Sequence, residues 1–69
     1  MAFQISIEVE REDDGRWIAD ILEFPGVVAY GQTREEAIAR AEAIAMRVIA
    51  DRIEQQVSAE AVNLTFAIA

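Results

Sequence analysis

The residues of this chain that could do chemistry are mainly carboxylates. Glu8, Asp20 and Glu42, with Glu10 beside the first, are the side chains that a metal-dependent nuclease could recruit, because carboxylate oxygens hold pairs of divalent cations. Glu8 and Glu10 would share one face of a strand, and Asp20 could approach them across a hairpin. No metal-ligand motif reinforces this spacing. A solvated strand face is therefore the preferred interpretation, and the nuclease is kept as an alternative.

Nucleophilic and phosphate-binding chemistry lacks its usual residues. The hydroxyls of Ser6, Thr33, Ser58 and Thr65 have no histidine to activate them, because the chain contains none. The absence of cysteine excludes disulfides and thiolate metal sites, and three glycines are too few for a phosphate-binding loop. We expect no catalytic residue, no cofactor and no metal ion, so the chain is predicted not to be an enzyme.

Hydrophobic patterning predicts four strands and one helix. Residues 3–9 alternate between apolar and polar side chains, as half-buried strands do, and residues 62–68 alternate in the same way. Residues 16–22 and 27–30 are β-rich and separated by a Pro-Gly turn. The helix is expected over residues 34–54. The order β-β-β-α-β predicts an α+β fold, in which one helix packs on one face of a small, mostly antiparallel sheet. The last strand is expected beside the first, and residues 1–69 form a single domain.

The second strand, residues 16–22, carries bulky side chains on both faces. We expect Trp17, Ala19 and Ile21 to face the helix, because this orientation avoids burying Asp20 without a partner. Ile18 and Leu22 then lie on the second face of the sheet. Trp17 and Tyr30 could form a recognition surface, but such aromatic side chains more often pack in the core or at its rim.

The helix start shows the spacing of a capping box. Thr33 can accept a hydrogen bond from the amide of Glu36, and the Glu36 carboxylate can accept one from the amide of Thr33. Gly31 permits the turn into this helix, and Glu36 can pair with Arg40 one turn later. Two apolar stripes follow along the helix. The stripe expected to face the sheet comprises Ile38, Ala41, Ile44, Ala45, Val48 and Ile49. The second comprises Ala39, Ala43, Met46, Ala50 and Ile53, with the spacing of a helix–helix seam. Alanine alone is also a good helix former, which would explain the second stripe without a partner.

The charge balance is acidic. The formal net charge is −7, from 13 acidic and 6 basic residues, all of the latter arginine. A negative field repels phosphate backbones, so direct nucleic-acid binding is not expected. The N-terminus lacks the pattern of a signal peptide and no apolar run is long enough to cross a membrane, so a cytoplasmic protein is predicted.

Turn, cap and helix-start residues together form a recognisable pattern. It consists of a glycine and an aromatic residue opening the second strand, a Pro-Gly turn, a G-x-T step and an E-E-A at the helix start. The residues are Gly15, Trp17, Pro25-Gly26, Gly31-Gln32-Thr33 and Glu35-Glu36-Ala37. Over residues 14–49 this pattern resembles the HicB-type antitoxin family. The chain departs from it at Leu22, Val27 and Gln32, where the family often has proline, cysteine and aspartate.

The resemblance implies a partial ribonuclease-H-like fold without nuclease activity, and a small basic ribonuclease toxin of the HicA type as the partner that it holds inactive. Typical family members also carry a C-terminal DNA-binding domain, and we expect a solitary domain without one here. The alternative is an orphan homo-oligomeric binding or scaffold protein without a toxin partner. Self-association, most simply as a homodimer, is expected through Ile18 and Leu22 or through the second helix stripe.

Overall fold

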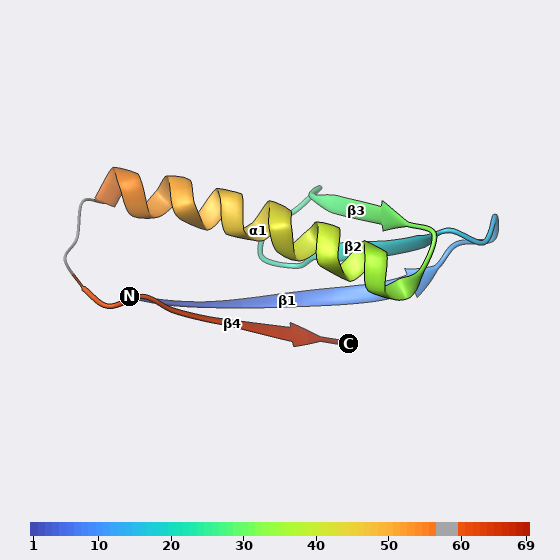
Figure 1. Cartoon of the computed structure of the whole chain (residues 1–69), viewed down its shortest axis with the longest axis horizontal. Coiled ribbons are helices and arrows are strands. Elements are labelled where there is room, and N and C mark those ends of the chain that lie inside the picture. Colours follow the sequence, from blue (N-terminus) through green and yellow to red (C-terminus); the bar gives the residue numbers. More distant parts are fainter. Residues whose placement is uncertain (57–59) are drawn as a thin grey trace.

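The computed structural model describes residues 1–56 and 60–69 of the chain. Its elements follow the predicted order (Figure 1): β1 (Ala2–Arg11), β2 (Trp17–Ile21), β3 (Val28–Gly31), α1 (Arg34–Gln56) and β4 (Asn63–Ile68). The predicted α+β class is confirmed. The helix ends two residues later than expected, because it also includes Gln55 and Gln56. Ser58 lies outside the described residues.

The sheet is mixed, with the strand order β3-β2-β1-β4. β1 pairs antiparallel with β2, and β2 pairs antiparallel with β3. After the crossover through α1, β4 pairs in parallel with β1, so that Ala2 lies beside Asn63 and Ile7 beside Ile68. The predicted neighbourhood of the first and last strands is therefore confirmed.

The core lies between α1 and one face of the sheet. Ile7 pairs with Ile21 across the β1–β2 ladder, and both side chains are fully buried. Ala19 is also buried, and Trp17 packs against the core, which confirms the predicted orientation of β2. The buried apolar residues are Ile5, Ile7, Ala19, Ile21, Phe24, Ala29, Ala37, Ala41, Ala45 and Ile49.

Alanines form most of the buried face of α1. Ala37, Ala41, Ala45 and Ile49 are buried at steps of four residues, which lets the helix lie close to the sheet. Ile44 and Val48 of the predicted stripe are half-buried and pack against the core. Two positions differ from expectation: Ala37, which was not placed on the stripe, is central to the buried face, and Ile38 is half-buried beside it. Ile53, expected on the second stripe, packs against the core instead.

The helix start is capped nearly as predicted. The amide of Glu36 donates to the Thr33 hydroxyl at 3.1 Å, and Arg40 pairs with the Glu36 carboxylate at 3.1 Å. The second hydrogen bond of the predicted capping box has a different donor. The Glu36 carboxylate accepts from the amide of Gln32 at 3.3 Å, one residue before Thr33.

Two of the three glycines serve turns through backbone conformation. Gly15 and Gly26 have φ angles of 91° and 84°, in the left-handed region that side chains disfavour. Gly31 permits the entry into the helix through space and not through a positive φ angle. A Cβ at this position would lie 2.5 Å from the backbone nitrogen of Ala37, so Gly31 is needed for the close approach of β3 to the first turn of α1.

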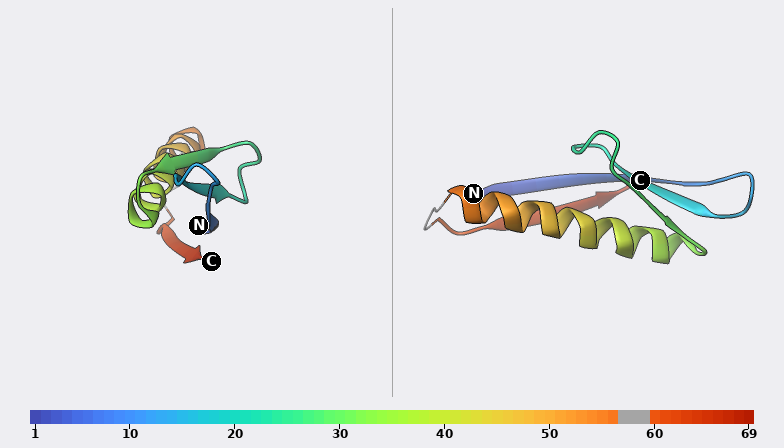
Figure 2. Two further views of the ribbon diagram at one scale, coloured as in Figure 1. Left: turned by 90° about the vertical axis from the view of Figure 1, so that its right-hand side faces the viewer. Right: turned by 90° about the horizontal axis from the view of Figure 1, so that it is seen from above.

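The molecule is elongated. Its principal extents are 45 × 18 × 18 Å, and one long helix runs along one side of a narrow sheet (Figure 2). The radius of gyration is 13.2 Å, whereas a compact domain of this length is expected near 11 Å. Within the described residues, α1 is not apolar over a stretch long enough to cross a bilayer.

Candidate functional site

The face of the sheet opposite α1 is the candidate binding surface. Register places Glu8 directly across from Asp20, and Glu10 across from Ile18. Along the two strands these residues alternate with Ile7, Val9 and Ala19, whose side chains face the helix. Glu8, Glu10, Ile18 and Asp20 therefore point away from the helix. The end-on view in Figure 2 shows the helix on one side of the sheet only. No helix or strand among residues 1–56 and 60–69 covers the other side.

Carboxylates gather on this uncovered face without forming a metal site. Glu42 lies on α1, which packs on the opposite face of the sheet, so the fold separates it from Glu8 and Asp20. The described part of the chain contains no group of three side chains that could hold a metal ion. The three carboxylates of the nuclease alternative are therefore not brought together. Glu8 and Asp20 remain as an adjacent acidic pair, whose electrostatic field favours a cationic partner.

Apolar side chains flank the acidic pair. Tyr30 pairs with Ile18 across the β2–β3 ladder, and Tyr30 is exposed. The guanidinium of Arg16 lies 4.6 Å from the centre of the Tyr30 ring, a cation–π contact. Leu22 follows β2 and is also exposed. Aromatic side chains are enriched in protein interfaces, and the adjacent acidic pair adds electrostatic complementarity to a cationic partner.

The β1–β2 turn extends the acidic surface at one end of the sheet. The Asp14 carboxylate accepts hydrogen bonds from the Arg16 amide at 3.0 Å and from Arg16 Nε at 2.8 Å. The hydrogen bond from the Arg16 amide, and after it the Arg16 guanidinium, hold the pKa of Asp14 below its usual value. The turn is closed by the Gly15 amide, which donates to the Glu12 carbonyl at 2.9 Å. Asp14 is therefore held in place, with its charge oriented by the turn.

A second carboxylate is held at the other end of the hairpin. Glu23 accepts a hydrogen bond from the Ser6 amide at 2.7 Å, and this bond lowers the pKa of the Glu23 carboxyl. The Ser6 carbonyl accepts from the Leu22 amide at 3.0 Å. The chain between β2 and β3 is thus fixed to β1 by both backbone groups of Ser6.

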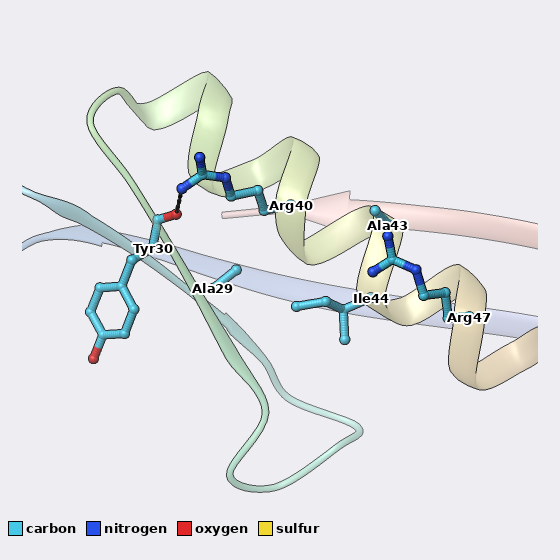
Figure 3. A pocket seen from close by; sticks show the side chains of 6 residues that line it. All are labelled: Ala29, Tyr30, Arg40, Ala43, Ile44 and Arg47. Carbon is cyan, nitrogen blue, oxygen red and sulfur yellow. Dashed lines mark hydrogen bonds between the residues drawn. The ribbon is translucent and has the colours of Figure 1, made fainter.

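A shallow hollow between β3 and α1 was not found from the sequence. It has a volume of about 380 Å³ and is lined by Ala29, Tyr30, Arg40, Ala43, Ile44 and Arg47 (Figure 3). Arg40 Nη1 donates to the Tyr30 carbonyl at 2.8 Å, while the Tyr30 ring points away from the helix. Arg47 forms no hydrogen bond or ion pair with the described residues. The available signal was the spacing of Arg40 and Arg47, seven residues apart on one helix face.

The remaining predicted site residues are dispersed. Gly15, Pro25 and Gly26 lie at turns, Gly31 ends β3, and Thr33 and Glu36 form the helix cap, so the roles of all six are structural. On the second stripe, Ala39, Met46 and Ala50 are exposed, whereas Ala43 borders the hollow. The hydroxyls of Ser6, Thr33 and Thr65 belong to separate elements.

Comparisons with known protein families, with curated proteins and with solved structures find no match to this chain.

Proposed function

We propose that this protein is a non-catalytic protein-binding module, whose uncovered sheet face binds a small basic protein in the cytoplasm. The observation that carries the proposal is the pairing of Glu8 with Asp20 on a face that no described element covers, beside Ile18 and the exposed Tyr30. The net charge of −7 would steer a cationic partner toward it.

The resemblance to HicB-type antitoxins supports a specific class of partner. In this proposal the basic protein is a HicA-type ribonuclease toxin, which the module sequesters and keeps inactive. Gly15, Trp17, the Pro25-Gly26 turn and the Thr33 cap carry the resemblance, and each occupies a turn, cap or core position that shapes the fold. The binding surface itself is inferred from charge and exposure.

The test begins with the reading frame next to the gene for this chain. If it encodes a small basic protein, the two proteins should co-purify and associate at low micromolar concentration, and the ribonuclease activity of the partner should fall when this chain is added. Failure to associate at that concentration would contradict the proposal.

Charge variants then locate the surface. The double variant Glu8→Gln/Asp20→Asn should weaken binding by about tenfold or more, because close interfacial charge pairs contribute about 1.5 kcal/mol or more. The matched control, Glu42→Gln/Glu54→Gln, removes the same charge from the helix and should change affinity much less. Equal losses in both double variants would show that net charge, and not this face, determines binding.

The second candidate is an orphan homo-oligomeric binding or scaffold protein. The exposed side chains of Leu22, Met46, Leu64 and Ile68 favour it, because an isolated small domain gains stability by covering such surface. Absence of any basic neighbour, together with a stable oligomer in solution, would favour this candidate. We expect neither nucleic-acid cleavage with Mg²⁺ or Mn²⁺ nor an operator gel shift. Cleavage that is lost in Glu8→Gln would instead support the nuclease.

A further inference from the structure

The outer edge of β4 is open. The Asn63 amide donates to the Met1 carbonyl and the Ala69 amide to the Ile7 carbonyl, each at 2.9 Å, so these residues direct their backbone groups toward β1. Because backbone direction alternates along a strand, Leu64, Phe66 and Ile68 direct their amides and carbonyls to the opposite edge. β4 is the last strand of the sheet, so no strand among the described residues meets those groups.

The same residues expose apolar side chains. Leu64 and Ile68 stand beside Phe3 and Ile7 on the helix-facing side, yet they are 36% and 38% exposed, whereas Ile7 is fully buried. The reason is that α1 packs mainly on β1, β2 and β3, and Figure 1 shows β4 along the sheet edge away from the helix. β4 also carries no charged side chain. Edge strands of monomers are usually short, charged or covered, and β4 is none of these.

The other edge of the sheet is protected. β3 spans only Val28–Gly31, and the outward carbonyl of Tyr30 is already bonded to Arg40. The two edges therefore differ, and β4 is the one prepared to accept another strand.

The distribution of charge indicates that a second copy of this chain can supply the pairing strand. Two copies that met through their uncovered faces would bring Glu8, Glu10 and Asp20 of one chain against the same residues of the other. At β4 two chains of charge −7 can meet without opposing charged side chains. The elongated shape, with its large radius of gyration, leaves this flank uncovered and available.

We propose that two copies of this chain dimerise by antiparallel pairing of β4 with β4. A two-fold axis normal to the sheet at Phe66 sets Leu64 of one copy across from Ile68 of the other. All three outward residues then form hydrogen-bonded pairs, and the exposed apolar side chains meet their counterparts. The axis keeps both helices on one side, so the uncovered acidic faces of the two copies form one continuous surface. The inference goes beyond the proposed function and holds with or without a basic partner.

The first test is the mass in solution. A six-residue edge buries less than the roughly 800 Å² per partner of a standard interface, so the dimer should dissociate on dilution. Sedimentation velocity over a concentration series should show the mass rising from one chain to two. Ile68→Lys should remain monomeric, because it places a charge on the edge. The matched control, Leu22→Lys, makes the same change at another exposed apolar residue and should dimerise like the wild type. A monomer up to the solubility limit would overturn the proposal, as would a dimer that Leu22→Lys dissociates and Ile68→Lys does not.

The second test measures the register. With Phe66 on the axis, Thr65 faces Ala67 of the other copy in a non-hydrogen-bonded pair, whose Cα separation of about 4.5 Å permits a disulfide. The chain has no cysteine of its own. An oxidised mixture of Thr65→Cys and Ala67→Cys should form a covalent dimer between the two variants, and neither variant alone should do so. Circular dichroism should show that both variants fold. Equal cross-linking of a single variant and the mixture, or no cross-linking of the folded mixture, would overturn the β4 pairing proposed here.

Discussion

Gly31 shows how one residue can determine the spacing between two elements. A Cβ at this position would meet the backbone of Glu36 and Ala37, which cannot rotate out of the way. Gly31→Ala should therefore cost about 3 kcal/mol of unfolding free energy, the upper end of overpacking effects. Gly26→Ala is the control, because it has a positive φ but open space around it, and it should cost about 1 kcal/mol. Urea denaturation measures both, and a smaller loss at Gly31 than at Gly26 would contradict this account.

Glu23 makes stability depend on pH. The hydrogen bond from the Ser6 amide lowers the pKa of the Glu23 carboxyl in the folded state, because the charged carboxylate accepts this bond more strongly than the protonated acid does. Its stabilisation is present at neutral pH, above the unfolded pKa, and is lost as the pH falls through the folded value. The difference in Tm between the wild type and Glu23→Gln should therefore be largest near pH 7 and should shrink as the pH falls below the usual pKa of glutamate and through the lowered pKa of the folded state.

Glu10→Gln serves as the control for the loss of one negative charge, because Glu10 does not contact the Ser6 amide. A Tm difference for Glu23→Gln that stayed constant from pH 7 to pH 3 would show that the Ser6 bond does not depend on the charge of Glu23.

At the scale of elements, the small residues of α1 determine how closely the helix packs on the sheet. Ala41 is fully buried, so Ala41→Leu has no space and should destabilise the protein by about 1–3 kcal/mol. Ala39→Leu adds the same atoms on the exposed side and should change stability by less than about 0.5 kcal/mol. Thermal unfolding compares the two variants. Similar effects at both positions would mean that the helix is free to shift away from the sheet.

The strands and the helix could be predicted from the sequence because their hydrophobic and capping patterns are local. Alternation located β1 and β4, and the Thr33 cap gave the helix start to the residue. The helix stripe was less accurate, since an alanine is ambiguous on its own. Ala37 is buried and Ala39 is exposed, and only the position of the sheet separates them. The physical reason for glycine at position 31 could not be read from the sequence, because the atoms that exclude a Cβ there belong to the following helix turn.

Across the whole molecule, the net charge of −7 predicts opposite salt effects on the two proposed associations. Binding of a basic partner should weaken as salt screens the attraction, since the Debye length is about 10 Å at 0.1 M. The β4 dimer should strengthen over the same range, because salt screens the repulsion between two acidic chains. Titrating NaCl in both binding measurements checks this pair of outcomes, and slopes of the same sign would contradict it.

The candidate site was only partly predictable. The sequence placed Glu8, Glu10 and Asp20 on possible neighbouring strands, but their pairing depends on the register, which the sequence left open. The spacing of Arg40 and Arg47 was the one signal for the hollow beside them, but the hollow itself depends on how α1 packs beside β3, which that spacing does not determine. The exposed edge of β4 likewise depends on where the helix stops covering the sheet.

The pairing of β4 with β1 also bears on how the chain is made. Ala2 pairs with Asn63, 61 residues later in the sequence, whereas β2, β3 and α1 contact one another within a continuous stretch of the chain. A ribosome releases β1 first and β4 last of these strands, so this edge of β1 stays unpaired until β4 has emerged. Because distant contacts also close slowly in refolding, this edge is the surface that a nascent chain most needs to have shielded from other nascent chains.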